Sequence, residues 1–384
     1  MTRIEDIASS TGLLQALKKM KSKTSVGIDK VTLNAFKESL KKSETGDKIV
    51  ASIYSGKYSP RSLLKKRIPK PNGTREIYIP TVQDRAVQRM IVKALNPIVE
   101  KRFLDHSFGF RPSRNQQQAV KAASQFVQEG HKICILLDLE DFFGNIDREK
   151  LRKLLRDYNI DSITRNLINK FIKARIIDTK VGSNQGIPAG MPIAPMLANI
   201  YLHPLDKYLQ RRNIRFIRYA DDITLFFKDL KSCQSFLNEF LGFCENRFGI
   251  FVNHQKTKIV TQGRRPILGY DVGDFGEITY CAKVFDRIRE EMDGLLAEPQ
   301  ISLSKLIEGI SKIIYARLTY YRNVENFEDL KQNCEPFLDV ARKRISEVSS
   351  KLELLIEAGI KLDRIEDHMM YSTQFAILAI LPSP

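Results

Sequence analysis

The sequence has few residues that could form a disulfide framework or a zinc site. Its 384 residues include five cysteines and five histidines, and none of them has a C-x-x-C or H-x-x-x-H spacing. The most apolar stretch, FAILAIL at residues 375–381, is too short to span a bilayer. The first residues, MTRIEDIASSTGLL, have acids and serines where a signal peptide needs an unbroken apolar segment. We therefore expect free, mostly buried thiols, a cytoplasmic protein and no membrane partner.

Acidic residues are scarce relative to basic ones. The chain has 62 lysines and arginines against 45 aspartates and glutamates, which gives a formal net charge of +17. A positive charge of this size favours a polyanionic partner, and nucleic acid is favoured over a membrane surface because no anchor segment is found. With 43% hydrophobic residues, the chain is long enough for two or three globular units.

Three segments predict the strands around which the fold is built. Residues 63–80, LLKKRIPKPNGTREIYIP, place Pro-Asn-Gly between two alternating runs and predict a hairpin. Residues 133–139 are almost continuously apolar, as in a strand covered on both faces. Residues 215–227, RFIRYADDITLFF, predict a second hairpin. Helical periodicity dominates elsewhere, and from about residue 286 onward it is the only pattern, so we expect an α+β fold.

Acidic residues stand at two of these strand ends. Asp138 comes at the end of the apolar run, and Asp221 and Asp222 stand at the tip of the second hairpin. Two adjacent aspartates on a turn often reflect only the preference of turns for Asp. Carboxylates brought together from two strands repel each other unless cations lie between them, and hard oxygen ligands suit Mg²⁺. The pattern therefore indicates a two-metal site for phosphoryl transfer.

The chain resembles the reverse transcriptases, and among them the bacterial group II intron-like lineage. The resemblance covers roughly residues 25–271 and rests on eight blocks that follow in order: SVGIDKVT, RIPKPNGTREIYIPTVQDRAVQR, SFGFRPSRNQQQAV, LLDLEDFFGNID, QGIPAGMPIAPMLANIYL, RYADDITLF, NHQKTKIV and ILGYDV. A lone YADD would be weak evidence, but the ordered set is specific. It implies a right-hand polymerase architecture, with fingers and palm of antiparallel sheet and helices at 1–275 and a helical thumb at 276–384.

The resemblance also implies roles in metal binding and catalysis. Asp138 and Asp221 match the metal-binding aspartates of an RNA-directed DNA polymerase that uses two Mg²⁺ ions, and Asp222 matches the supporting neighbour. Leu139, next to Asp138, belongs to the same metal site. Lys256 matches a lysine proposed to protonate the leaving pyrophosphate.

Further residues match positions that bind the deoxynucleotide or the nucleic acid. Lys70 and Arg75 match fingers residues that pair with the triphosphate, with non-specific RNA contact as the alternative. Phe143 matches the aromatic side chain that excludes a 2′-hydroxyl, with core packing as the alternative because Phe142 is adjacent. Nucleotide contacts are also expected at Ala189 and Gly190, and nucleic-acid contacts at Arg111 and Arg114.

The glycine-rich block departs from the family pattern. Relatives usually have P-Q-G-x-x-x-S-P where this chain has PAGMPIAP, so Ala189 replaces a glutamine that contacts the nucleotide and Ala194 replaces a serine. Gly144 replaces an acid often found after the aromatic residue. These changes bear on nucleotide handling and leave the metal site intact.

Several functional contexts share these motifs. The chain has no N-A-x-x-H signature of retron enzymes and no C-x-x-C pairs of an added nuclease. By elimination we expect a stand-alone enzyme of phage defence that copies a dedicated non-coding RNA into cDNA. A retron-like or reduced group II intron enzyme is the alternative with the same chemistry. An RNA-binding maturase-like scaffold and a template-independent nucleotidyl transferase are alternatives of other classes, and the template, primer and oligomeric state stay open.

Overall fold

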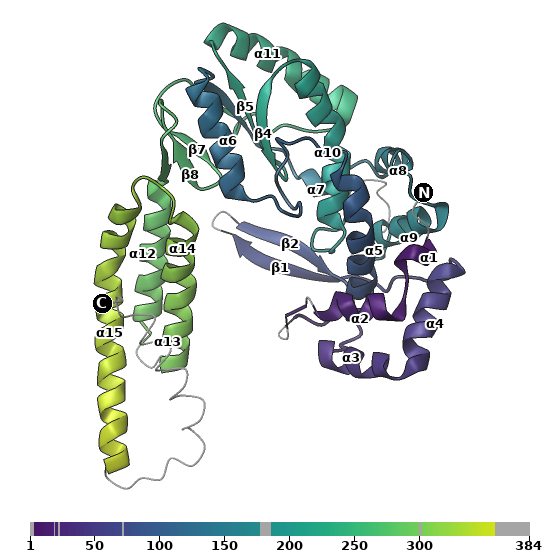
Figure 1. Ribbon diagram of the computed structural model, residues 1–384, viewed down its shortest axis with the longest axis horizontal. Coiled ribbons are helices and arrows are strands. Elements are labelled where there is room, and N and C mark those ends of the chain that lie inside the picture. The colour runs from purple at the N-terminus through teal and green to yellow at the C-terminus, as the bar shows by residue number, and fades with distance from the viewer. Residues whose placement is uncertain are drawn as a thin grey trace. The chain divides into compact units, whose positions relative to one another are not determined.

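The protein is described by a computed structural model that covers residues 4–18, 20–21, 24–70, 73–176, 186–298 and 302–357. The chain forms two compact units that divide between Gln262 and Gly263 (Figure 1). Antiparallel sheets and helices make up the described residues, which confirms the predicted α+β fold. The predicted assignment of residues 1–275 to fingers and palm and of 276–384 to a thumb stays a prediction.

The first unit begins with helices that pack on one long helix. The helices are α1 (Ile4–Ile7), α2 (Ser10–Lys18), α3 (Leu33–Lys41), α4 (Ser43–Tyr54) and α5 (Val82–Glu100). Leu13 and Leu17 of α2 are fully buried, as an amphipathic helix requires, whereas Leu14 points to solvent. The helical apolar spacing of Val87, Met90, Ile91 and Leu95 predicts a helix that stops near Pro97, and α5 continues through this proline to Glu100. A proline in the last turn removes only one main-chain hydrogen bond, so the helix tolerates it.

Two strands between α4 and α5 form the first predicted hairpin. They are β1 (Leu64–Lys70) and β2 (Gly73–Ile79), paired antiparallel with Leu64 opposite Ile79 and Lys70 opposite Gly73. The prediction of a hairpin at residues 63–80 is therefore confirmed.

A four-stranded antiparallel sheet forms the centre of the first unit. Its order is β4 (Arg215–Tyr219), β5 (Asp222–Phe227), β3 (Ile133–Leu137) and β6 (Lys258–Val260). The other helices of this unit are α6 (Gln116–Gln128), α7 (Phe142–Asn145), α8 (Arg148–Arg156), α9 (Ser162–Ile172), α10 (Ala194–Arg211), α11 (Leu230–Phe243) and the π-helical turn η1 (Cys244–Phe248).

Helices cover both faces of this sheet. Phe226 and Phe227 are neighbours on β5 and therefore point to opposite faces. The ring of Phe226 lies 5.4 Å from Phe126 of α6, and the ring of Phe227 lies 5.5 Å from Phe236 of α11. Helices therefore cover both faces of the sheet, which confirms the prediction that the strand at 133–139 is covered on both sides.

The second unit combines a small sheet with helices. The sheet is antiparallel in the order β7 (Arg265–Ile267), β8 (Tyr270–Val272) and β9 (Ile278–Tyr280). The helices are α12 (Ala282–Leu296), α13 (Leu303–Ile310), η2 (Ser311–Tyr315), α14 (Ala316–Tyr321) and α15 (Phe327–Glu357). The predicted helical character beyond residue 286 is confirmed for the described residues.

Two expectations about composition can be compared with the structure. The five cysteines, all within the described residues, form no disulfide; those at 134, 233, 244 and 334 are buried, and Cys281 is partly exposed. Within the described ranges, no helix is both long and apolar enough to cross a membrane. The apolar stretch at 375–381 lies outside the described residues.

Candidate active site

The β4–β5 hairpin turns on only two residues. Tyr219 pairs with Asp222, so Ala220 and Asp221 make the turn. Ala220 has a φ of +60°, a left-handed conformation that L-residues other than Gly, Asn and Asp seldom adopt. Such strain costs on the order of 1 kcal/mol and persists only where the surroundings hold it. The surroundings of this turn therefore decide where Asp221 points.

A fully buried arginine holds the turn from behind. Arg218 donates two hydrogen bonds to Asp206 of α10, at 2.7 Å from Nε and 2.6 Å from Nη2. It also donates to Asn199 Oδ1 at 2.8 Å, to Ser107 Oγ at 2.6 Å and to the carbonyl of Ala220 at 3.0 Å. A buried charge is stable only when it is paired and fully hydrogen-bonded, and Arg218 meets both conditions.

The loop at residues 106–109 braces the same turn. The N–H of Phe108 donates to the carbonyl of Arg218 at 2.7 Å, and the N–H of Arg218 donates to the carbonyl of His106 at 2.8 Å. A Cβ at Gly109 would lie 2.2 Å from the nitrogen of Ala220, so only glycine fits there. The Asn199 amide donates to the Gly109 carbonyl at 2.8 Å. The SFGF block therefore serves as the support of the hairpin tip.

Asp138 lies at the same edge of the sheet as the hairpin tip. Leu137 of β3 pairs with Ile223 of β5, so Asp138 and Asp222 occupy adjoining strand ends. Burial and the negative charges of Asp221 and Asp138 raise the pKa of Asp222 to about 6. The three predicted carboxylates thus lie close enough to repel one another.

Lys256 is the cation nearest to these carboxylates in the described part of the chain. Its Nζ lies 3.5 Å from Asp138 Oδ2, and the two side chains are 68% and 42% exposed. Asn253 places it: its N–H donates to the Asp138 carbonyl at 2.8 Å, and its Oδ1 accepts from the N–H of Lys256 at 3.2 Å. Asn253 is a site residue that the sequence reasoning missed, although an Asx-type turn before a lysine is a recognisable signal.

The donors at this edge suit a hard divalent cation in their chemistry. Asp138 and Asp221 offer carboxylate oxygens. Leu139 has a buried hydrocarbon side chain, so it can offer only its main-chain carbonyl oxygen. Burial is the main cause of the raised pKa of Asp222, and the negative charges of Asp221 and Asp138 add to it. Among the described residues, however, no three Asp, Glu, His or Cys side chains are gathered closely enough to form a ready metal cluster.

These residues open onto one cavity of about 700 Å³. Among its lining residues are seven of the predicted site residues: Arg75, Asp138, Leu139, Phe143, Ala189, Asp221 and Lys256. They come from β2, from the segment after β3, from the segment before β6, from α7, from the glycine block and from the hairpin turn. Asp222 and Gly190 do not line it.

The two adjacent phenylalanines have different surroundings. Phe142 is 6% exposed and packs edge-on against Tyr201 at 6.2 Å, whereas Phe143 is only partly buried. Both border the cavity. Phe143 is thus the more accessible ring, as its predicted role requires, and that role stays a prediction.

The glycine block is attached to the first hairpin through its main chain. The N–H of Tyr78 donates to the carbonyl of Ala189 at 2.8 Å, and Gly190 has a φ of +103° with its missing Cβ 2.9 Å from the carbonyl oxygen of Tyr78. Gly190 therefore allows a close approach of two main chains. At Gly144, a Cβ would meet the Asp141 carboxylate at 2.0 Å, so Asp141 occupies the space of the acid that relatives often carry there.

The remaining predicted residues lie away from the cavity or outside the described side chains. Arg111 is buried, pairs with Glu100 at 2.6 Å and donates to the carbonyls of Leu104 and Ser107. It therefore fixes its own loop, and the structure gives no support for the predicted template contact. Arg114 pairs with Asp105 at 2.6 Å near the surface. Lys70 ends β1, and its side chain lies outside the described part of the structure.

Comparisons with known proteins agree with this geometry. Residues 65–272 match the family model described as reverse transcriptase (RNA-dependent DNA polymerase). Protein YkfC of Escherichia coli strain K12 is 30% identical over 248 residues, which cover 54% of this chain and 65% of YkfC. The group II intron-encoded protein LtrA of Lactococcus lactis subsp. cremoris is 32% identical over 212 residues, which cover 54% of this chain and 34% of LtrA.

A third relative has a different genetic context. The retron Ec86 reverse transcriptase of Escherichia coli is 24% identical over 212 residues, which cover 54% of this chain and 61% of that protein. The matched region thus spans between about one third and two thirds of the length of these three relatives.

Proposed function

The chain belongs to the reverse transcriptase family, and we propose that it is an RNA-directed DNA polymerase that adds deoxynucleotides to a primer 3′-hydroxyl. The observation that carries this proposal is the single cavity onto which Asp138, Asp221, Lys256, Arg75 and Phe143 open. These residues come from separate segments of the sequence. Because most of their polar groups are accessible, core packing does not explain why they lie together.

Each residue has a role in the proposed reaction. The primer 3′-hydroxyl loses its proton to solvent as its oxygen attacks the α-phosphorus of the dNTP, a new P–O bond forms, and the bond to the pyrophosphate oxygen breaks. Arg75 neutralises charge on the triphosphate, and Lys256 donates a proton to the departing pyrophosphate. The ring of Phe143 fills the space that a ribose 2′-hydroxyl would need.

We propose Mg²⁺ as the metal ion of this site. Reverse transcriptase domains generally use divalent metal ions. Asp138 and Asp221, with the main-chain carbonyl of Leu139, would hold two ions, and Asp222 would support them. When bound, the ions would stabilise the charge on the attacking and leaving oxygens.

We further propose that the template is a dedicated non-coding RNA and that its copying serves defence against phage. The net charge of +17 supports a polyanionic partner. The defence role rests on the elimination made from the sequence motifs and on analogy at the level of the family. A retron or a reduced intron would supply a different RNA to the same chemistry.

The test is to purify the protein with its bound nucleic acid, add dNTPs and Mg²⁺, and sequence both RNA and DNA. A variant with Asp221→Ala and Asp222→Ala is the catalytic control. DNA complementary to one co-purified RNA, absent from the variant, is expected. DNA without a complementary RNA would instead support a template-independent nucleotidyl transferase, and bound RNA without any DNA would support a maturase-like scaffold.

A further inference from the structure

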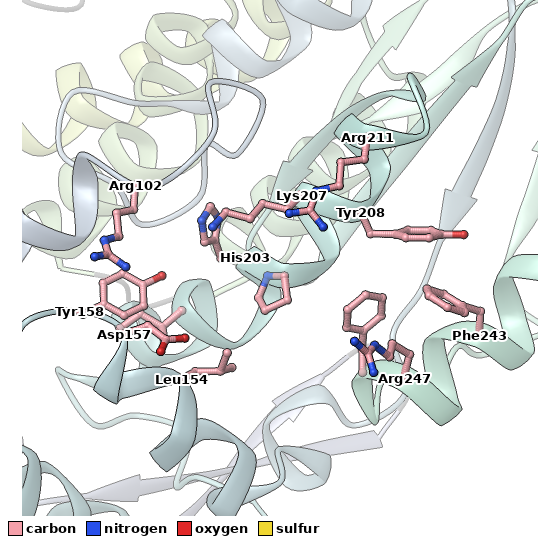
Figure 2. Close-up of a pocket in the computed structure, with 13 residues that line it drawn as sticks. Arg102, Leu154, Asp157, Tyr158, His203, Lys207, Tyr208, Arg211, Phe243 and Arg247 are labelled. Carbon is pink, nitrogen blue, oxygen red and sulfur yellow. The ribbon is translucent and has the colours of Figure 1, made fainter.

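A second cavity, of about 560 Å³, lies in the first unit and shares no lining residue with the active-site cavity. We call it the α10 pocket, because the second half of α10 forms its centre. The connection between α8 and α9 and the end of α11 with η1 complete it, together with Arg102 after α5 (Figure 2). None of its residues has a role in the proposed polymerase reaction.

The rim of the α10 pocket is strongly basic. Arg102, Lys207, Arg211 and Arg247 are exposed and line it, and Asp157 is the one carboxylate beside them. Four cations and one carboxylate give the pocket a formal charge of +3. No carboxylate of the described residues lies within ion-pair distance of any of the four cations. By contrast, Arg212, one residue beyond Arg211, pairs with Glu239 at 3.0 Å.

The floor of the pocket holds two buried polar side chains without partners. His203 is 4% exposed, and neither of its ring nitrogens has a hydrogen-bond partner. Tyr158 is 3% exposed, and its hydroxyl is also unpaired. Buried polar groups are nearly always satisfied in folded proteins, so an unpaired group that lines a cavity is available to bond a ligand there.

The charge state of His203 suits a neutral ligand group. Burial, aided by the neighbouring cations Lys207, Arg218 and Arg102, lowers the pKa of His203 to about 4. The imidazole is therefore neutral at physiological pH and offers one donor and one acceptor. The edge of a nucleobase presents donors and acceptors in the same way.

The opposite side of the pocket is aromatic. Tyr208 stacks on Phe243 with ring centroids 4.4 Å apart and an interplanar angle of 28°, and Phe248 packs edge-on against both rings. Tyr208 and Phe243 are partly exposed, and the Tyr208 ring also lies near Phe240 and the Arg212 guanidinium. Figure 2 shows the rings of Tyr208 and Phe243 with Arg247 at one side of the pocket, and Arg102, Tyr158 and His203 at the other. Partly exposed aromatic side chains beside cations are the kind of surface on which the bases of single-stranded nucleic acids pack.

We propose that the α10 pocket binds one unstacked nucleotide of a single-stranded RNA. The base packs on Tyr208 and Phe243, its polar edge bonds to His203 and Tyr158, and the cations of the rim hold the phosphates on either side. Asp157 accepts a hydrogen bond from a ribose hydroxyl. A strand is favoured over a free nucleotide because the four cations surround the opening, and a single phosphate could not contact them all. Binding to this pocket can be measured without synthesis, so the proposal does not depend on polymerase activity.

The first test compares two triple variants of the full chain, freed of nucleic acid. One is Lys207→Ala, Arg211→Ala, Arg247→Ala, and the matched control is Lys121→Ala, Lys228→Ala, Lys231→Ala, which removes three exposed lysines elsewhere on the same unit. The probe is a fluorescein-labelled 12-nucleotide RNA of mixed sequence, measured by anisotropy. We expect the pocket variant to lose at least about tenfold in affinity and the control less than about threefold. Equal losses would overturn the proposal.

The second test uses the unpaired polar groups. His203→Phe and Tyr158→Phe keep the ring volume and remove the atoms without partners, so we expect weaker RNA binding together with an unchanged or higher Tm. A lower Tm with unchanged binding would show that these side chains serve packing and would overturn the proposal.

A third measurement locates the RNA and separates the two sources of a nucleotide. RNA that carries 4-thiouridine should crosslink to peptides within residues 200–211 or 243–248, and crosslinks confined to other peptides would contradict the assignment. AMP and UMP serve as free-nucleotide probes in calorimetry. Binding of either as tight as that of the RNA would show a pocket for free nucleotides instead of a strand.

Discussion

The two sides of the β4–β5 hairpin tip are built in opposite ways. Behind the turn, Arg218, Asp206, Asn199 and Ser107 are fully or almost fully buried, and their charges and hydrogen bonds are balanced. In front of it, the carboxylates at 138, 221 and 222 face solvent to differing degrees and repel one another. The buried hydrogen bonds behind the turn fix its position. The carboxylates in front of it remain available to bind a ligand. Substitutions on the two sides should therefore separate stability from activity.

The largest effect is expected in front of the turn. Asp221→Asn keeps the size of the side chain and removes its charge, so polymerisation should fall by at least about 10³-fold, or about 4 kcal/mol in the barrier. The free energy of unfolding should not fall, because the repulsion on Asp222 is relieved. Primer extension and urea unfolding measure the two quantities. A large loss of stability would mean that Asp221 is part of the supporting side.

Behind the turn, Arg218→Met should act on stability first. It leaves Asp206 as a buried charge without a partner, which costs about 3–5 kcal/mol. The measurement is urea unfolding, with the double variant Arg218→Met, Asp206→Leu as the matched control. The double variant should regain part of the loss, because both charges are gone. A loss under about 1 kcal/mol for Arg218→Met alone would show that the buried pair does not support the turn.

The sequence predicted the front of the site far better than its support. Asp138 and Asp221 stand at the ends of predicted strands, so local patterns were enough to place them at the sheet edge, whereas Lys256 was predicted only from the family resemblance. The support depends on contacts between distant segments, since Arg218 bonds to Ser107, 111 residues away. No periodicity or spacing marks such a contact. Arg111 shows the same limit, because a basic residue in a glycine-containing loop gives no sign of whether it faces solvent or pairs with a glutamate of the same unit.

The fold was predictable where the residues of one element are enough to determine its secondary structure. The hairpins at 63–80 and 215–227 and the two-sided strand at 133–139 followed from alternation and turn residues. Helix α5 shows where such rules fail, because Pro97 is tolerated inside the last turn. The α10 pocket was not predicted, since the spacing of Ile200, Leu205 and Tyr208 indicates only an apolar helical stripe. Only burial without partners distinguishes His203 from an ordinary core residue.

A smaller effect in front of the turn is expected at Lys256. Lys256→Met removes the proton donor and keeps the apolar stem, so the rate of polymerisation should fall by about 10²-fold or more. Stability should hardly change, because the pair with Asp138 is largely exposed. Single-turnover incorporation measured against pH is the readout. The matched control is Lys258→Met, an exposed lysine two residues away, which should leave the rate within about twofold.

The smallest effect should come from the turn itself. Ala220→Gly relieves the left-handed strain at a φ of +60°, at the cost of a more flexible unfolded chain and the loss of one buried methyl group. The net gain in the free energy of unfolding should be no more than about 1 kcal/mol. Polymerisation should change less than in Asp221→Asn, because Arg218 still bonds to the carbonyl of residue 220. If activity instead falls as far as it does in Asp221→Asn, then the alanine methyl group, and not the buried network, holds the turn. Combining Ala220→Gly with Arg218→Met decides between the two, since a supporting network predicts that the pair of changes costs more activity than the sum of each alone.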